Sequence, residues 1–120
     1  MATSTSKNDI ELTPAAFQVL LALAAGEGHG YGMMKFVEDL TGGVVRLPAG
    51  TLYRTIARLV ADGLVEETGE GDHSAPHDAR RRYYRITSLG RRVAAEQAQL
   101  LERMVAVADQ IGLIQERSKR

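Results

Sequence analysis

Apolar and polar positions follow two different periods along this chain. Apolar residues recur at helical spacing within "LTPAAFQVLLALAAGEG", "GYGMMKFVEDLTGG" and "PAGTLYRTIARLVADG", and again in a longer segment that starts at Ser88. Between the third and fourth segments, "LVEE" and "RYYRIT" alternate with the period of two that is typical of strands. The pattern predicts three short helices, an antiparallel hairpin with a long tip, and a long fourth helix.

Capping residues mark where the helices begin and end. Thr13 is the expected N-cap of the first helix, because the following Pro14 is favoured at the first helical position. Ser88 is the expected cap of the fourth helix. Glycines break the helical runs, and the expected stops are Gly26, Gly28, Gly42, Gly43 and Gly63.

Each of the first three helices has one apolar face, which predicts the core. The expected inner residues are Phe17, Leu20, Leu21 and Leu23 or Ala24 in the first helix, Met33, Phe36, Val37 and Leu40 in the second, and Leu52, Ile56, Leu59 and Val60 in the third. On the third helix, Arg54 and Arg58 lie on the opposite side and Tyr53 lies at the border. That outer side is expected to be free for a partner.

The order of three helices and a hairpin predicts a winged helix-turn-helix, mainly α with a small β-hairpin. In this arrangement the third helix enters the major groove of DNA and the hairpin lies along the backbone or the minor groove. We expect a tail at residues 1–9, the DNA-binding domain at residues 10–87, a dimerisation helix at residues 88–115, and a second tail at residues 116–120.

The fourth helix carries an apolar stripe that is too long for a core of this size to cover. A second copy of the chain is the simplest partner, so the stripe predicts a two-fold homodimer. Such a dimer places two helices about 34 Å apart and therefore favours an inverted-repeat site in double-stranded DNA. The predicted dimerisation residues are Val93, Leu100, Leu101, Met104, Ala108 and Ile111.

Composition narrows the class of protein. The chain has 120 residues, of which 44% are hydrophobic and 25% are charged, so one globular domain is expected. It has no cysteine, no apolar run near the roughly 18 residues of a membrane span, and no leader, which favours a cytoplasmic protein without a membrane partner. A phosphate loop and a metal-ligand pair on a helix are also absent, so an enzyme is not expected, and neither a cofactor nor a metal is.

The zero net charge hides two neighbouring segments of opposite sign. Residues 80–92 hold six arginines and no acid, and residues 66–78 hold five acids and no Lys or Arg. A local cluster of arginines is typical of a nucleic-acid contact, although the whole chain is neutral.

Three motifs in register resemble the PadR-like transcriptional regulators. They are "GHGYGMMKFVEDLTGG", "LPAGTLYRTIARLVADGLVEE" and "RRRYYRITSLGRR", and the resemblance covers residues 12–112. It implies a homodimeric winged-helix DNA-binding protein, usually a repressor that a small molecule releases from DNA. The single C-terminal helix resembles the smaller of the two family subtypes.

The resemblance also implies which residues contact DNA. Gly50, Thr51, Leu52 and Tyr53 match the opening of the helix that reads DNA; Leu52 is structural there, while Thr51 and Tyr53 are candidates for contact. The basic residues of the wing fall on Arg80, Arg81 and Arg82. Arg54 stands where the family usually has proline and adds a donor that can bond guanine with two hydrogen bonds. The acidic tip of the wing is expected to stay off DNA.

Each of these assignments has an alternative. Arg54 and Arg58 could form a solvated helix face, Tyr53 could pack on the second helix, and the arginines at 80–82 could only protect a strand edge. His73 and His77, with the neighbouring Asp72 and Asp78, could hold a metal or form a solvated tip; Gly71, Ser74 and Pro76 favour a loop and the solvated tip. The alternative function is a winged-helix module for protein contact, which would show no salt-dependent binding of DNA.

A small hydrophobic effector is expected between two copies of the chain. Its candidate lining residues are Phe17, Met104 and Ala108, on the first and fourth helices. Methionine adapts readily to ligands but also fills cores, so a tightly packed seam without a cavity is the alternative.

Overall fold

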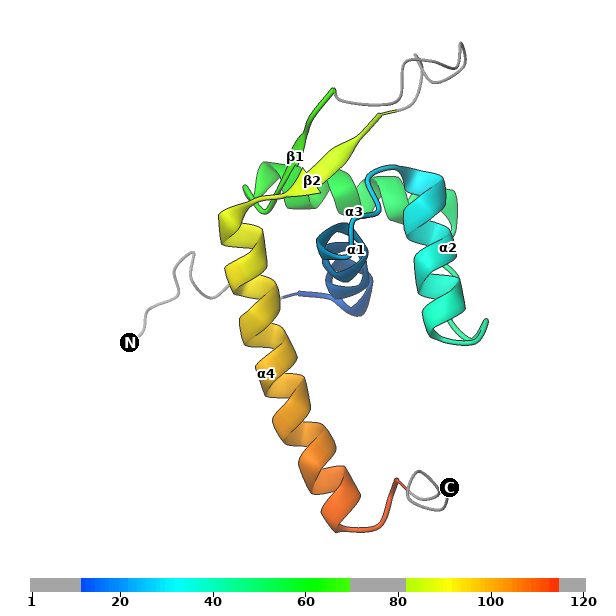
Figure 1. Ribbon diagram of the computed structural model, residues 1–120, viewed down its shortest axis with the longest axis vertical. Coiled ribbons are helices and arrows are strands. Elements are labelled where there is room, and N and C mark those ends of the chain that lie inside the picture. The colour runs from blue at the N-terminus through cyan, green and yellow to red at the C-terminus, as the bar shows by residue number, and fades with distance from the viewer. Residues whose placement is uncertain (1–11, 70–81, 115–120) are drawn as a thin grey trace.

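The computed structural model describes residues 12–69 and 82–114. Its elements, in order, are α1 (Pro14–Ala24), α2 (Gly30–Leu40), α3 (Ala49–Ala61), β1 (Val65–Glu67), β2 (Tyr84–Ile86) and α4 (Ser88–Gln110). Figure 1 shows α1 at the centre, the hairpin beside α3, and α4 running away from the other elements. The predicted mainly helical fold, with its single small hairpin, is confirmed.

Helix α1 is the centre of the core. It contacts α2, α3, α4 and β2, and its residues Val19, Leu20 and Ala22 are completely buried. The helix begins as predicted, because the Thr13 side chain accepts a hydrogen bond from the Ala16 amide at 3.1 Å and Pro14 occupies the first turn. A correctly placed first helix therefore gives every other element a surface to pack against.

Most of the predicted inner residues are buried, and the exceptions lie where no described element covers them. Confirmed core residues are Leu20, Leu23, Met33, Val37, Leu52, Ile56 and Leu59, while Phe17, Leu21 and Phe36 are half-buried. Ala24 is exposed at the end of α1, and Leu40 is 58% exposed at the end of α2. Val60 is 40% exposed, because the short hairpin leaves that side of α3 open.

The hairpin is antiparallel, with Val65 opposite Ile86, Glu66 opposite Arg85 and Glu67 opposite Tyr84. Val65, Tyr84 and Ile86 are buried against the core, as the alternating pattern predicts. A further bond, from the Tyr84 amide to the Gly28 carbonyl at 2.8 Å, ties the hairpin to the connection between α1 and α2. The orientation of the hairpin relative to α2 is thereby fixed.

Thr87 joins α3, the hairpin and α4 at one point. Its hydroxyl donates to the Gly63 carbonyl at 2.7 Å and its amide donates to the Leu64 carbonyl at 3.0 Å. The hydroxyl oxygen also accepts from the Gly90 amide at 3.0 Å, so Thr87 is the N-cap of α4. The predicted cap, Ser88, is wrong by one position: Thr87 still has the extended backbone of the strand, and Ser88 is already helical.

Helix α4 lies against the domain only at its start. Gly90 and Val93 are buried, and Val93 belongs to the core of its own chain. Further along the same face, Leu100 is 43% and Met104 52% exposed. The helix ends at Gln110, earlier than the predicted bound of 115.

We expect Gly90→Ala to destabilise the fold. An added Cβ would collide with the backbone carbonyl of Leu64 and approach the Ile86 side chain within 2.8 Å. Backbone cannot move aside as a side chain can, so the cost should be about 1–3 kcal/mol, in spite of the better helix propensity of alanine.

Gly50→Ala is the matched control for this change. Gly50 is exposed in α3, and its added Cβ would meet only the Arg54 guanidinium at 3.4 Å, so the gain in helix propensity should stabilise by about 0.5 kcal/mol. Urea unfolding followed by circular dichroism measures both. Equal effects of the two substitutions would contradict the close contact at Gly90.

Candidate nucleic-acid interface

The outer side of α3 presents two arginines to solvent. Arg54 and Arg58 are both exposed, one helical turn apart. The Arg54 guanidinium donates to the Thr51 hydroxyl at 3.5 Å, a long bond that leaves most of its donors available. No carboxylate among the described residues forms an ion pair with either arginine. This face of α3 therefore has unneutralised positive charge.

The two arginines border a shallow hollow on the side of α3 that faces the start of α1. The hollow has a volume of about 850 Å³, and its other walls include Thr13 and Pro14 of α1 and Asp62 after α3. The predicted placement of Arg54 and Arg58 together on the outer face of α3 is consistent with this geometry, while their contact with DNA stays a prediction.

Tyr53 lies between α3 and the first turn of α2. Its side chain is 46% exposed, and its hydroxyl lies so close to Gly30 that a Cβ at this position would collide with it. Both alternatives for this border residue are thus present in one side chain, because the ring packs on α2 while part of it faces solvent. Glycine at position 30 is what allows the close approach of the two helices.

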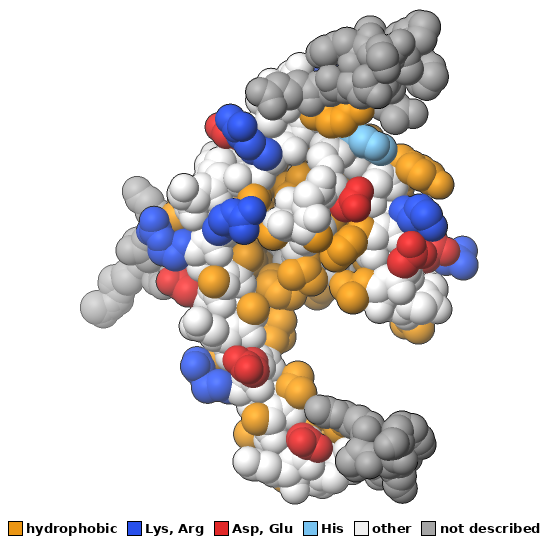
Figure 2. All heavy atoms as spheres, viewed as in Figure 1, with side chains coloured by type: hydrophobic (Ala, Val, Ile, Leu, Met, Phe, Trp, Pro, Cys, Tyr) orange, Lys and Arg blue, Asp and Glu red, His pale blue; other side chains and the backbone are white. Residues whose placement is uncertain are grey.

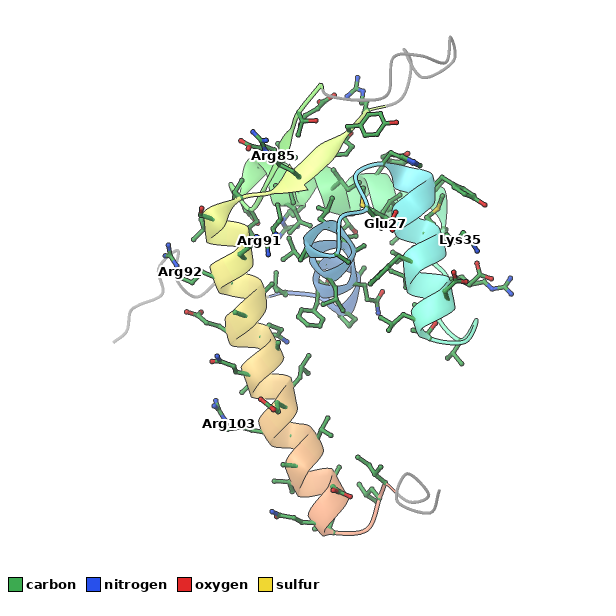
Figure 3. The ribbon with its side chains drawn as sticks, in the orientation of Figure 1. Glu27, Lys35, Arg85, Arg91, Arg92 and Arg103 are labelled. Atoms are coloured by element: carbon green, nitrogen blue, oxygen red, sulfur yellow. The ribbon has the colours of Figure 1, made fainter. Side chains whose placement is uncertain are left out.

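The charges of the wing, which is β1, β2 and the segment between them, are partly paired across the hairpin. The Arg85 guanidinium donates to the Glu66 carboxylate at 2.7 Å, and Arg82 lies 3.7 Å from the Glu67 carboxylate. Figure 3 shows Arg85 on the hairpin, apart from Arg91 and Arg92 at the start of α4. The positive stretch in the sequence is therefore not free positive charge in the fold. Counting the acidic and basic segments separately missed that antiparallel strands bring them together.

Of the three predicted wing arginines, the structure describes one. Arg82 is exposed at the base of the wing, whereas Arg80 and Arg81 lie outside the described residues, as do His73 and His77. Burial raises the pKa of the Tyr84 phenol beside Arg82, and the guanidinium opposes this rise in part. Tyr84 therefore remains a neutral hydroxyl at physiological pH.

His29 is a residue of this surface that the sequence analysis did not select. Its Nδ1 accepts a hydrogen bond from the Gly32 amide at 3.3 Å, which makes His29 the N-cap of α2. Its ring also meets the Tyr83 ring edge-on, with centroids 5.4 Å apart. The contact links α2 to the wing. Histidine is not among the common N-cap residues, so the usual capping signals did not indicate it.

A model of the PadR-like family of transcriptional regulators matches residues 19–96. The chain belongs to this family. Membership confirms the resemblance carried by the three sequence motifs, and it makes the chain a DNA-binding transcriptional regulator and not an enzyme. No curated protein sequence matches the chain significantly. None of the helices in the described residues is long and apolar enough to cross a membrane.

Solved structures of regulators share the fold. A PadR family transcription regulator from Clostridium difficile R20291 is 19% identical, with a TM-score of 0.67 over 82% of this chain and 98% of the other. A transcriptional regulator from Clostridium thermocellum is 23% identical, with a TM-score of 0.66 over 82% and 89%. ZitR of Lactococcus lactis, a zinc-responsive MarR family member, is 16% identical, with a TM-score of 0.65 over 87% and 63%. These similarities establish the winged-helix fold.

We expect Glu67→Gln to strengthen binding to duplex DNA of any sequence. The change removes the carboxylate that lies beside Arg82 and adds one positive charge to the wing. Both side chains of the pair are about half exposed or more, so the gain should be modest, about twofold to fivefold in Kd.

Glu96→Gln makes the same charge change on an exposed position of α4 and serves as the control. Fluorescence anisotropy of a labelled duplex measures both variants against the parent. An unchanged Kd for Glu67→Gln, or an equal gain for Glu96→Gln, would contradict a role for the wing pair.

Proposed function

We infer that this regulator is a homodimeric repressor that binds an inverted-repeat operator with α3 and the base of the wing, and that a small hydrophobic molecule releases it. The observation that carries the DNA contact is the exposed pair Arg54 and Arg58, without a carboxylate partner among the described residues, on the outer face of a helix in a winged-helix fold. In this fold, the corresponding helix enters the major groove.

The roles within this interface follow from geometry and charge. Arg54 reads a base edge, since its guanidinium is held near the helix by Thr51 and can form two parallel bonds to guanine. Arg58, Arg80, Arg81 and Arg82 hold phosphates, and Thr51 and Tyr53 add bonds to the backbone. The wing contributes less than its sequence predicts, because Arg82 is already beside Glu67.

Dimerisation is supported by the apolar stripe of α4, which we define as Leu100, Met104, Val107 and Ile111. These side chains are 43–66% exposed, and the 23 residues of α4 span about 35 Å. Figure 2 shows hydrophobic side chains along α4 on the side of the concave region beside it. A second copy would cover the stripe. Leu101 and Ala108 flank it, whereas Val93 is used by the core of its own chain and drops out of the proposed interface.

The proposed repression takes place on DNA in the cytoplasm. The effector seam between two copies, lined by Phe17, Met104 and Ala108, remains part of this proposal. In the single chain Phe17 and Ala108 are half-buried and Met104 is exposed, and the hollows of the described surface discussed above and below have other walls. Any cavity at this place would require the partner copy.

Sequence-specific binding is tested first with DNA from upstream of the gene that encodes the chain. Fluorescence anisotropy at two salt concentrations, beside a scrambled duplex, should give a lower Kd for the upstream DNA and a steep loss of affinity with salt. Absence of salt-dependent binding to either duplex would favour the alternative, a module for protein contact.

Arg54→Ala should relax the sequence preference of the protein. Loss of a bidentate contact to guanine should cost about 1–3 kcal/mol on the specific duplex and much less on the scrambled one. The control is Lys35→Ala, which removes an exposed cation that donates to Asp39 at 3.3 Å on the outer side of α2. Competition anisotropy with both duplexes measures the ratio. An unchanged ratio for Arg54→Ala would remove Arg54 from the base contacts.

Met104→Glu should convert the dimer to monomers. The substitution places a charge in the middle of the apolar stripe, where burial against the same position of a second copy is strongly unfavourable. Val44→Glu is the control, since Val44 is 85% exposed and lies between α2 and α3. Sedimentation velocity gives the oligomeric state. A parent protein that is monomeric, or a Met104→Glu variant that stays dimeric, would disprove this interface.

A further inference from the structure

A second hollow, which we call the wing hollow, lies between α3, the start of α2 and the wing. It has a volume of about 810 Å³, within the range of about 300–1,000 Å³ that is usual for small-molecule sites. Its walls come from three elements that are held together by the contact of Tyr53 with Gly30, by the contact of His29 with Tyr83, and by the Tyr84 to Gly28 hydrogen bond. The hollow is therefore part of the folded monomer.

The floor of the wing hollow is apolar and its sides are aromatic. Ile56, Ala57 and Val60 of α3 form one wall, and Val60 is 40% exposed there although the sequence places it on the inner face. Tyr31, Tyr53 and Tyr84 supply rings around this floor. Rings and aliphatic side chains in one concave place favour a flat aromatic occupant, which can stack on the rings and cover the floor.

The polar groups of the wing hollow restrict the charge of the occupant. Glu67 and Arg82 both line it and lie 3.7 Å apart. An anion would be attracted by Arg82 and repelled by Glu67, and a cation would meet the opposite pair of forces. A neutral group that donates to the carboxylate and accepts from the guanidinium, such as a phenol or a carboxamide, satisfies both. The Nδ1 atom of His29 does not compete, since it already accepts from the Gly32 amide.

We propose that the wing hollow binds a flat, uncharged aromatic molecule that carries a phenol or amide group. Ala57 and Val60 contact its ring, and Glu67 and Arg82 bind its polar group. Two of the lining residues, Tyr53 and Arg82, are also in the proposed DNA contacts, so an occupant and DNA compete. This last consequence rests on the proposed function, while the binding of the molecule itself does not.

The test begins with the full chain and no DNA. The probe is 4-hydroxybenzamide, and 4-hydroxybenzoate and 4-hydroxybenzylamine are probes of the same ring with a negative and a positive group. Ligand-observed NMR titration at neutral pH should show the tightest binding for the amide, with Kd values at least about fivefold weaker for the two charged probes. Equal binding of all three, or tighter binding of a charged probe, would overturn the proposal.

A pair of variants then locates the binding. Ala57→Phe should fill the wing hollow and weaken binding of 4-hydroxybenzamide by about tenfold or more. Ala61→Phe is the matched control, because Ala61 is an exposed alanine of the same helix, one turn further along, that does not line the hollow. Circular dichroism confirms that both variants are folded. Equal binding by parent and Ala57→Phe would place the probe elsewhere and overturn the proposal.

Competition with DNA is measured last, by anisotropy with increasing 4-hydroxybenzamide. Release of the duplex from the parent and not from Ala57→Phe supports the competition. If the chain binds the probe in the wing hollow but binds no DNA, the site stands and the proposed function fails. If it binds DNA but shows no preference for the neutral probe, the proposed function stands and the site fails.

Discussion

The contact of Thr87 and Gly90 with Gly63 and Leu64 is the constraint on which the rest of the structure depends. Hydrogen bonds from Thr87 reach the carbonyls of both Gly63 and Leu64, and Gly90 lies against the Leu64 carbonyl with no room for a side chain. Here α3 has just ended, β1 is about to begin, β2 has ended and α4 starts. The helix proposed to read DNA and the helix proposed to join two copies are therefore oriented by the same few backbone atoms.

This arrangement explains how a small core can support two surfaces. The core around α1 covers the inner side of α3 and the first turns of α4 and leaves the remainder of both helices to solvent. Charge distinguishes the two exposed surfaces: α3 presents Arg54 and Arg58, and α4 presents aliphatic side chains and Met104. One is suited to a phosphate backbone and the other to an apolar partner.

Local chemistry explains which features could be predicted from the sequence. Thr13 before Pro14, and Gly63 after α3, act on neighbouring backbone, so the boundaries they predict agree with the structure. Thr87 and Ser88 are both good caps, and only the end of β2 decides between them. Periodicity places Val60 and Val93 on apolar faces but does not say what covers them. Val60 was wrongly assigned to the core because the hairpin is short, and Val93 is covered by its own domain.

The cross-strand pairs of the wing have a consequence for how the protein responds to ions. Arg82 and Arg85 each lie beside a carboxylate of the neighbouring strand, and these side chains are 47–68% exposed. The wing therefore brings its own counter-ions, and a phosphate that approaches Arg82 exchanges one anion for another without releasing a bound ion to the solvent. Ion release then occurs mainly at α3, so that helix alone sets most of the dependence of DNA affinity on salt.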